Sequence, residues 1–189
     1  MLRMAFYKKV KGAPVNALIA GWTWLSNIKT PPYSHAEIGL LLGGKWTYYS
    51  STNRDGAKGC RWIKEENLFK NPGNWDVYEF EEGRPIEFII ADLNSTLGSK
   101  YDWWGIAGFA TPFGLVNSKK KWYCSEVCYY GLIGKWKKRI SPRRLFSFIR
   151  ANFKTRMVRH DDLVQEDFFG LEDSANKEYS AGKEIKVGI

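Results

Sequence analysis

Alternation of apolar and polar residues predicts that the first half of the chain is mainly β-structure. Over residues 33–42, three apolar side chains stand at every second position, with polar residues or glycine between them. A period of two is typical of a strand with one buried face. Gly43-Gly44 then favours a tight turn into a second strand over 45–52, so a hairpin is expected. Further extended segments are predicted at 3–10, 60–63 and, after a turn at 71–74, 75–80.

Apolar residues three and four apart predict helices elsewhere. The strongest pattern covers 85–97, where Ile86, Ile89, Ile90, Leu93 and Leu97 share a face and Gly98 ends the helix. Ser141-Pro142 supplies an N-cap and a first-turn proline for a helix that runs to about residue 153. Helices are also expected over 14–25 and, shorter, over 101–109. This order of strands followed by helices predicts an α+β fold with an antiparallel sheet.

A helix is also predicted after the polar loop at 117–120, and it carries two of the three cysteines. Cys124, Val127, Cys128 and Gly131 fall on one face, which places Cys124 in the first turn of a buried helix. Unpaired N–H groups and the helix dipole at that position favour a thiolate, which is the nucleophilic form of cysteine. The alternative is that Cys124 is a small apolar core residue, as most free cysteines are. Cys128, one turn later, is interpreted as core.

Composition favours one domain and an anionic partner. The chain has 189 residues, 44% of them hydrophobic and 16% aromatic, which suffices for a single core over residues 1–170. The last residues, 171–189, are polar and aperiodic and are predicted to form a loosely ordered tail. A net charge of +9 indicates a nucleic acid, an acidic lipid or an anionic cell-wall polymer as partner, without choosing among them.

The cysteines and histidines argue against disulfides and metal. Three cysteines without paired spacing do not predict a disulfide framework, and two histidines without a C-x-x-C motif make a zinc site improbable. No cofactor is expected. The N-terminus lacks the apolar segment of a secretory signal, and the longest uncharged run, 103–118, is too short for a membrane span, which needs roughly 20 apolar residues. We therefore expect a soluble cytoplasmic protein.

A nucleophilic cysteine needs a general base and a group that orients the base. His160 lies in a charged stretch and is discounted, which leaves His35 at the start of the first hairpin strand. The orienting group could be Glu37, two residues along the same face, or a hydroxyl of Tyr48 or Ser50 on the second strand. A carboxylate would hold an imidazolium better than a hydroxyl, but directly opposed residues on neighbouring strands approach more easily. Ser50 is therefore the expected orienter.

Three short motifs occur in an order known from one protein family. They are Tyr33-Ser34-His35-Ala36-Glu37-Ile38, Tyr101-Asp102, and Trp122-Tyr123-Cys124-Ser125-Glu126 followed by Ile140-Ser141-Pro142. This set, spread over roughly residues 1–150, resembles the permuted NlpC/P60 proteins. These are the YiiX-like, papain-fold group, related to the lecithin:retinol acyltransferase family. As in the permuted group, histidine precedes cysteine.

The resemblance implies a papain-like fold, in which a small antiparallel sheet or barrel carrying histidine packs against the helix of the nucleophile. It implies a cysteine amidase, peptidase or lipid-type acyl hydrolase, with Cys124 as nucleophile and His35 as base, acting on peptidoglycan peptides or lipid acyl groups. Tyr101 would line the cleft, and Glu126 would be a helix-terminus residue near the site. Relatives carry a carboxylate on the second hairpin strand, where this chain has Ser50.

Two other classes of function are consistent with the composition. The stretch Lys135-Trp136-Lys137-Lys138-Arg139 could stack on bases and neutralise phosphates in a nucleic-acid-binding protein. A catalytically inactive member of the family, encoded by a phage and located in the virion or the host cytoplasm, would instead serve as an interaction or structural protein.

Overall fold

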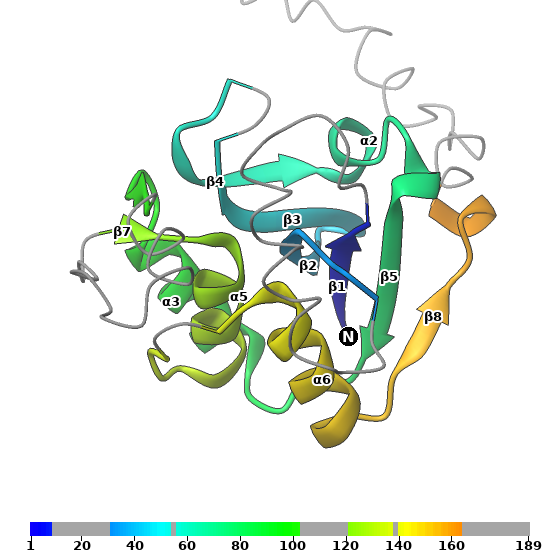
Figure 1. Cartoon of the computed structure of the whole chain (residues 1–189). Helices are drawn as coiled ribbons and strands as arrows, with labels where there is room; N and C mark the ends of the chain where they lie inside the picture. Colours follow the sequence, from blue (N-terminus) through cyan, green and yellow to red (C-terminus); the bar gives the residue numbers. More distant parts are fainter. Residues whose placement is uncertain (9–30, 54–55, 103–120, 138–139, 164–189) are drawn as a thin grey trace, which may run out of the picture.

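The sheet of the protein is built from eight strands and is strongly curved (Figure 1). The computed structural model describes residues 1–8, 31–53, 56–102, 121–137 and 140–163. The strands follow the order β7-β6-β4-β3-β2-β1-β5-β8, and each neighbouring pair is antiparallel except β6 and β7. Their bounds are β1 Leu2–Tyr7, β2 His35–Leu42, β3 Lys45–Thr52, β4 Gly59–Lys64, β5 Trp75–Phe80, β6 Lys100–Tyr101, β7 Lys121–Trp122 and β8 Arg156–Val158.

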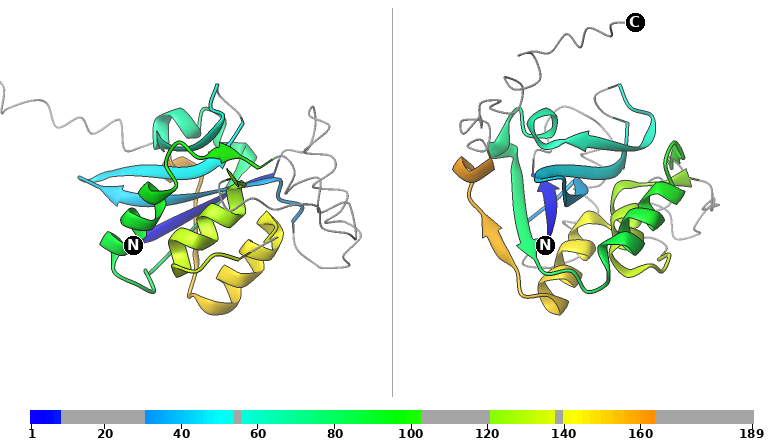
Figure 2. Two further views of the ribbon diagram at one scale, coloured as in Figure 1. Left: turned by 90° about the vertical axis from the view of Figure 1, so that its left-hand side faces the viewer. Right: turned by 180° about the vertical axis from the view of Figure 1, so that it is seen from behind.

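The helices lie on both sides of the sheet (Figure 2). One side is covered by α3 (Ile86–Ser95), α5 (Cys124–Ile133) and α6 (Pro142–Asn152), and α5 packs directly on β2 and β3. The other side is covered by the short α2 (Glu65–Leu68) and by the 3-10 turns η1 (Pro72–Asn74) and η2 (Asp161–Leu163). The α+β class and the antiparallel arrangement expected from the sequence are therefore confirmed.

Local signals placed most elements correctly. The β2–β3 hairpin turns at Gly43 and Gly44, whose φ angles of 57° and 78° are those that a tight hairpin turn requires of both central residues. Ser141 accepts a hydrogen bond from the N–H of Arg144 at 3.2 Å, and α6 runs from Pro142 as predicted.

Two predictions were wrong in detail. Leu97 lies beyond the end of α3 and is exposed, because the helix ends at Ser95. Tyr101 belongs to strand β6 and not to a helix, since residues 100–101 pair with β7. The helix predicted over 14–25, the remainder of that over 101–109 and the tail at 171–189 lie outside the described residues.

The core has two parts, one on each side of the sheet. Beneath the helices, Ala36, Ile38 and Leu40 of β2 pack with the inner faces of α3, α5 and α6, as the alternation along this strand predicts. On the other side, Tyr48 lies over Gly39 of β2, and a Cβ at position 39 would come within 2.6 Å of its ring. None of the described helices has the length and apolar character needed to cross a lipid bilayer.

Candidate active site

Hydrogen bonds to three other segments of the chain fix the position of the start of α5. The carbonyl oxygen of Trp122, just before the helix, accepts from the hydroxyl of Ser51 at 2.6 Å and from the N–H of Asp102 at 3.0 Å. Within the first turn, the hydroxyl of Ser125 donates to the carbonyl oxygen of Ile140 at 2.6 Å. These contacts hold Cys124, the first residue of α5, against the N-terminal end of β2.

The structure brings Cys124 and His35 together, although they are 89 positions apart in the sequence. Each side chain shifts the pKa of the other, and both residues are buried. His35 is the first residue of β2 and pairs with Tyr7 of β1, and the ring of Trp75 stands edge-on to its imidazole at 6.2 Å between centroids. The imidazole is therefore flanked by the indole of Trp75.

The electrostatics of this pair favour the charged forms. Burial alone would raise the pKa of the Cys124 thiol, but the charge and hydrogen bond of His35, together with the N–H groups of Ala36 and Ser125, lower it below its ordinary value. Burial alone would lower the pKa of His35, but the Cys124 thiolate and the Glu37 carboxylate outweigh it, and the pKa of His35 is raised. Both shifts favour a thiolate beside an imidazolium.

Glu37 is the residue whose side chain contacts the imidazole of His35. His35 Nε2 lies 3.0 Å from Glu37 Oε1. Because Nε2 donates its proton to a carboxylate, Nδ1 is the ring nitrogen that serves Cys124. Burial alone would raise the pKa of Glu37, but the charge of Arg61 and the hydrogen bonds from His35 and Arg61 lower it to about 2.

Ser50 does not occupy this position, which corrects the expectation from the sequence. Its hydroxyl donates to the carbonyl oxygen of Ala36 at 2.7 Å. A serine side chain is short and is held here by the backbone, whereas a glutamate is long enough to bridge the roughly 7 Å between alternate residues of a strand. Ser50 therefore bonds to the backbone of Ala36, the residue between His35 and Glu37, and not to the imidazole that it was expected to orient.

The remaining candidates lie around the site or away from it. Glu126 is buried in the first turn of α5, where it interacts with Tyr123. Tyr101 is half-buried on β6 and pairs with Trp122, next to the start of α5. Tyr48 lies opposite Gly39, on the face of β2 that also carries Glu37, and its hydroxyl donates to Glu65 at 3.1 Å, so this hydroxyl does not donate to His35.

Sequence reasoning missed Arg61. Its guanidinium donates two hydrogen bonds to Glu37, from Nη1 to Oε2 and from Nη2 to Oε1, each at 2.9 Å. Arg61 belongs to β4, and β3 lies between that strand and β2 in the sheet. No local signal in the sequence relates the two residues, because only the order of the strands brings them together.

The other cysteines and the second histidine are placed differently. Burial raises the pKa of Cys60 and, together with the charges of Cys124 and Glu37, that of Cys128. His160 is half-buried, with Nε2 placed 2.8 Å from the carbonyl oxygen of Trp75. Cys124 is thus the only one of the three thiols whose pKa is lowered.

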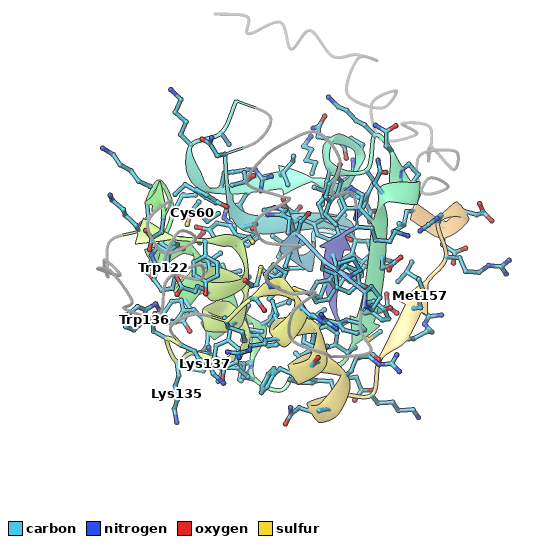
Figure 3. The ribbon with its side chains drawn as sticks, viewed as in Figure 1. Cys60, Trp122, Lys135, Trp136, Lys137 and Met157 are labelled. Atoms are coloured by element: carbon cyan, nitrogen blue, oxygen red, sulfur yellow. The ribbon has the colours of Figure 1, made fainter. Side chains whose placement is uncertain are left out.

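The described part of the basic stretch, residues 135–137, lies at the far end of α5. Figure 3 shows Lys135, Trp136 and Lys137 together at the lower left, on the opposite side of the molecule from Met157 of β8. The ring of Trp136 is half-buried against the core, and the ammonium of Lys137 stands 5.4 Å from the ring centroid of Tyr129. The side chains that would stack on bases are therefore engaged within the protein.

Comparison with known proteins gives a similarity of shape to solved structures. No known family profile matches the chain, and no curated protein does. Among solved structures, the metalloprotein yiiX from Escherichia coli O157:H7 is similar over 71% of this chain and 66% of that one, at 16% identity and a TM-score of 0.46. This chain spans just under two thirds of the length of that protein. A similarity this weak says nothing about function, so the chemistry of the site has to follow from its own residues.

The described residues contain no group of three or more His, Cys, Asp or Glu side chains that could hold a metal ion. The groups at the site are instead a thiol, an imidazole, a carboxylate and a guanidinium. Such a set can deprotonate a nucleophile, stabilise the resulting ion pair and return a proton to a leaving group.

Proposed function

We propose that the protein is a cysteine hydrolase that uses Cys124, His35 and Glu37 as a catalytic triad. The observation that carries the proposal is the placement of buried Cys124, at the start of α5, beside buried His35, whose imidazole lies 3.0 Å from the Glu37 carboxylate. A cysteine that only fills the core does not need an oriented histidine beside it, whereas a nucleophilic cysteine does. The histidine-bearing sheet and the cysteine-bearing helix agree with what the resemblance to permuted NlpC/P60 proteins implies.

The reaction follows from the positions of the groups. The Cys124 thiolate attacks a carbonyl carbon and forms a C–S bond, and the oxyanion is met by the N–H groups at the start of α5. When the C–N, C–O or C–S bond of the substrate breaks, His35 passes its Nδ1 proton to the departing amine, alcohol or thiol. Water then attacks the thioester while His35 accepts its proton. The acid leaves, and the thiolate and imidazolium are restored.

Glu37 has a definite part in this cycle. Its negative charge stabilises the imidazolium in both halves of the reaction, and its hydrogen bond keeps the proton of neutral His35 on Nε2. The substrate class is an amide, ester or thioester. Peptidoglycan peptides and lipid acyl groups are the candidates that the family resemblance suggests, and the net charge of +9 suits an anionic substrate or surface.

The proposal is tested with a panel of electrophilic acyl probes, including peptide and lipid esters and thioesters. We expect an acyl adduct on Cys124, found by peptide mapping, that disappears with time as product acid is released. His35→Ala should abolish acylation, and Arg144→Met, on the exposed face of α6, should not affect it. Acylation of Cys60 or Cys128 in place of Cys124 would refute the proposal.

Nucleic-acid binding is not proposed, because Trp136 packs on the core and Lys137 lies over a tyrosine ring. A binding assay at increasing salt concentration checks this choice, since phosphate contacts weaken steeply with salt. Tight, salt-dependent binding of oligonucleotides by a protein that no acyl probe labels would favour the binding function.

A further inference from the structure

The contact between Glu37 and His35 is an unusual one for a strand. Residues two apart point in parallel from the same face, so their side chains do not naturally turn toward each other. A free glutamate has several rotamers, and its terminal carboxylate rotates over a broad range. Something outside β2 must hold Glu37 with Oε1 against the imidazole, at the observed 3.0 Å.

Arg61 provides this hold. It reaches from β4 across β3 and grips both carboxylate oxygens at 2.9 Å, so the planes of the guanidinium and the carboxylate are matched. Oε1 is shared between Arg61 and His35, whereas Oε2 is held by Arg61. The side chain of Glu37 is 1% exposed and that of Arg61 17%, so water competes little for these bonds.

We propose that Arg61 is a positioning residue of the active site, which aims the Glu37 carboxylate at His35 and acts on Cys124 only through these two residues. The proposal deepens the proposed function and rests on it. The two hydrogen bonds of Arg61 go to Glu37, which in turn contacts the base His35. Its effect on reactivity must therefore disappear when the Glu37 carboxylate is absent.

The charges around the site support this assignment. The cation of Arg61 faces the anion of Glu37, and the pKa shifts of His35 and Cys124 favour opposite charges on that pair, so the charges of the four side chains offset one another. Further titratable groups near the site are Cys128 of α5 and Tyr123, which directly precedes α5. Beyond Tyr123 lie Glu126 of α5 and Asp102, on the segment after β6. Burial and nearby negative charge raise the pKa values of Cys128 and Tyr123, so both are neutral.

The direct charge of Arg61 would act on the pair whether or not position 37 carries a carboxylate, because a cation favours a nearby thiolate and disfavours a nearby imidazolium. The two mechanisms therefore differ in their dependence on Glu37. If Arg61 positions Glu37, its loss weakens the hold on the imidazolium and makes the Cys124 thiolate harder to form, and this effect needs the carboxylate. If Arg61 acted only as a charge, its loss would have the same effect when position 37 is glutamine.

The test measures the rate of Cys124 alkylation by iodoacetamide as a function of pH in the full-length protein. For Arg61→Met we expect the midpoint of the profile to rise by about one unit, with roughly tenfold slower alkylation below it. Arg61→Lys should alkylate faster than Arg61→Met but more slowly than wild type, because an ammonium keeps the charge but does not bind both carboxylate oxygens as a guanidinium does. The matched control is Arg156→Met, which removes an arginine from another buried glutamate, Glu79, at the sheet edge. It should leave the profile unchanged.

A double variant makes the test decisive. In the Glu37→Gln background, Arg61→Met should change the alkylation profile less than twofold. An equal effect of Arg61→Met in both backgrounds, or a midpoint that falls, would overturn the proposal. If circular dichroism shows that Arg61→Met alone is unfolded, the comparison of Arg61→Lys with wild type, in both backgrounds, decides in the same way.

The outcomes separate this inference from the proposed function. Protein that shows the expected alkylation profiles but hydrolyses no acyl substrate would contradict the function and leave the role of Arg61 standing. Protein that hydrolyses acyl substrates equally well with and without Arg61, at an unchanged alkylation midpoint, would contradict the role of Arg61 alone.

Discussion

Replacing Glu37 by glutamine should make the protein less sensitive to acid. The carboxyl of Glu37 has an ordinary pKa of 4.5 when unfolded and about 2 when folded, because Arg61 and His35 overcome the effect of burial. A group whose pKa is depressed by folding stabilises the folded state above its unfolded pKa. That contribution is lost as the pH falls toward the folded pKa.

The size of the effect follows from the two pKa values. A difference of this size contributes about 3 kcal/mol to the free energy of unfolding at pH 6, at roughly 1.4 kcal/mol per unit. By the same relation, about 2 kcal/mol of it is lost between pH 6 and pH 3. Glutamine cannot ionise, so the variant lacks this loss, although it is less stable at pH 6 because Arg61 has lost its counter-charge.

Urea denaturation of wild type and Glu37→Gln at several pH values between 3 and 6 measures the difference. The two free energies of unfolding should converge by about 2 kcal/mol as the pH falls. Glu66→Gln, on the exposed surface of α2, serves as the control and should run parallel to wild type. Parallel curves for Glu37→Gln and wild type would show that Glu37 is not held as a buried carboxylate, and would refute the reasoning.

Three further predictions concern the thiols, the orienting group and the core. Limiting iodoacetamide at pH 7 should label Cys124 before the two other cysteines, whose thiol pKa values are raised; preferential labelling of either would contradict the ion pair. Ser50→Ala should lower kcat of acyl hydrolysis much less than Glu37→Gln, because its hydroxyl bonds to the backbone; the reverse order would restore Ser50 as orienter. Arg3→Met should lower the free energy of unfolding, measured by urea denaturation, by about 3–5 kcal/mol, since it removes the buried cation that the carboxylates of Glu65 and Glu79 share; a loss under 1 kcal/mol would contradict this.

Local patterns in the sequence were sufficient for most elements of the fold. The paired glycines at 43–44 set a tight turn, and Ser141 with Pro142 starts a helix, whatever the rest of the chain does. The helical spacing after residue 123 also placed Cys124 in a first turn. Such signals depend on backbone angles and on neighbours a few residues away, so they can be recognised without the fold.

The composition of the active site could be predicted only in part. The sequence offers two histidines, and strand position favoured His35; the motifs then favoured Cys124 as its partner. The choice between Ser50 and Glu37 was wrong because it rested on the distance between opposed Cβ atoms. It ignored the length of the side chains and the competing hydrogen bond to Ala36.

Only the tertiary structure decided how the site is held. Arg61 follows Glu37 by 24 positions and sits on a strand that does not adjoin β2, so no periodicity relates them. The same holds for the start of α5, which Ser51 and Asp102 anchor from two other strands or their ends. Periodicity in a chain reports which face of an element is buried, whereas the order of the strands decides which side chains meet. That order depends on the packing of the whole core.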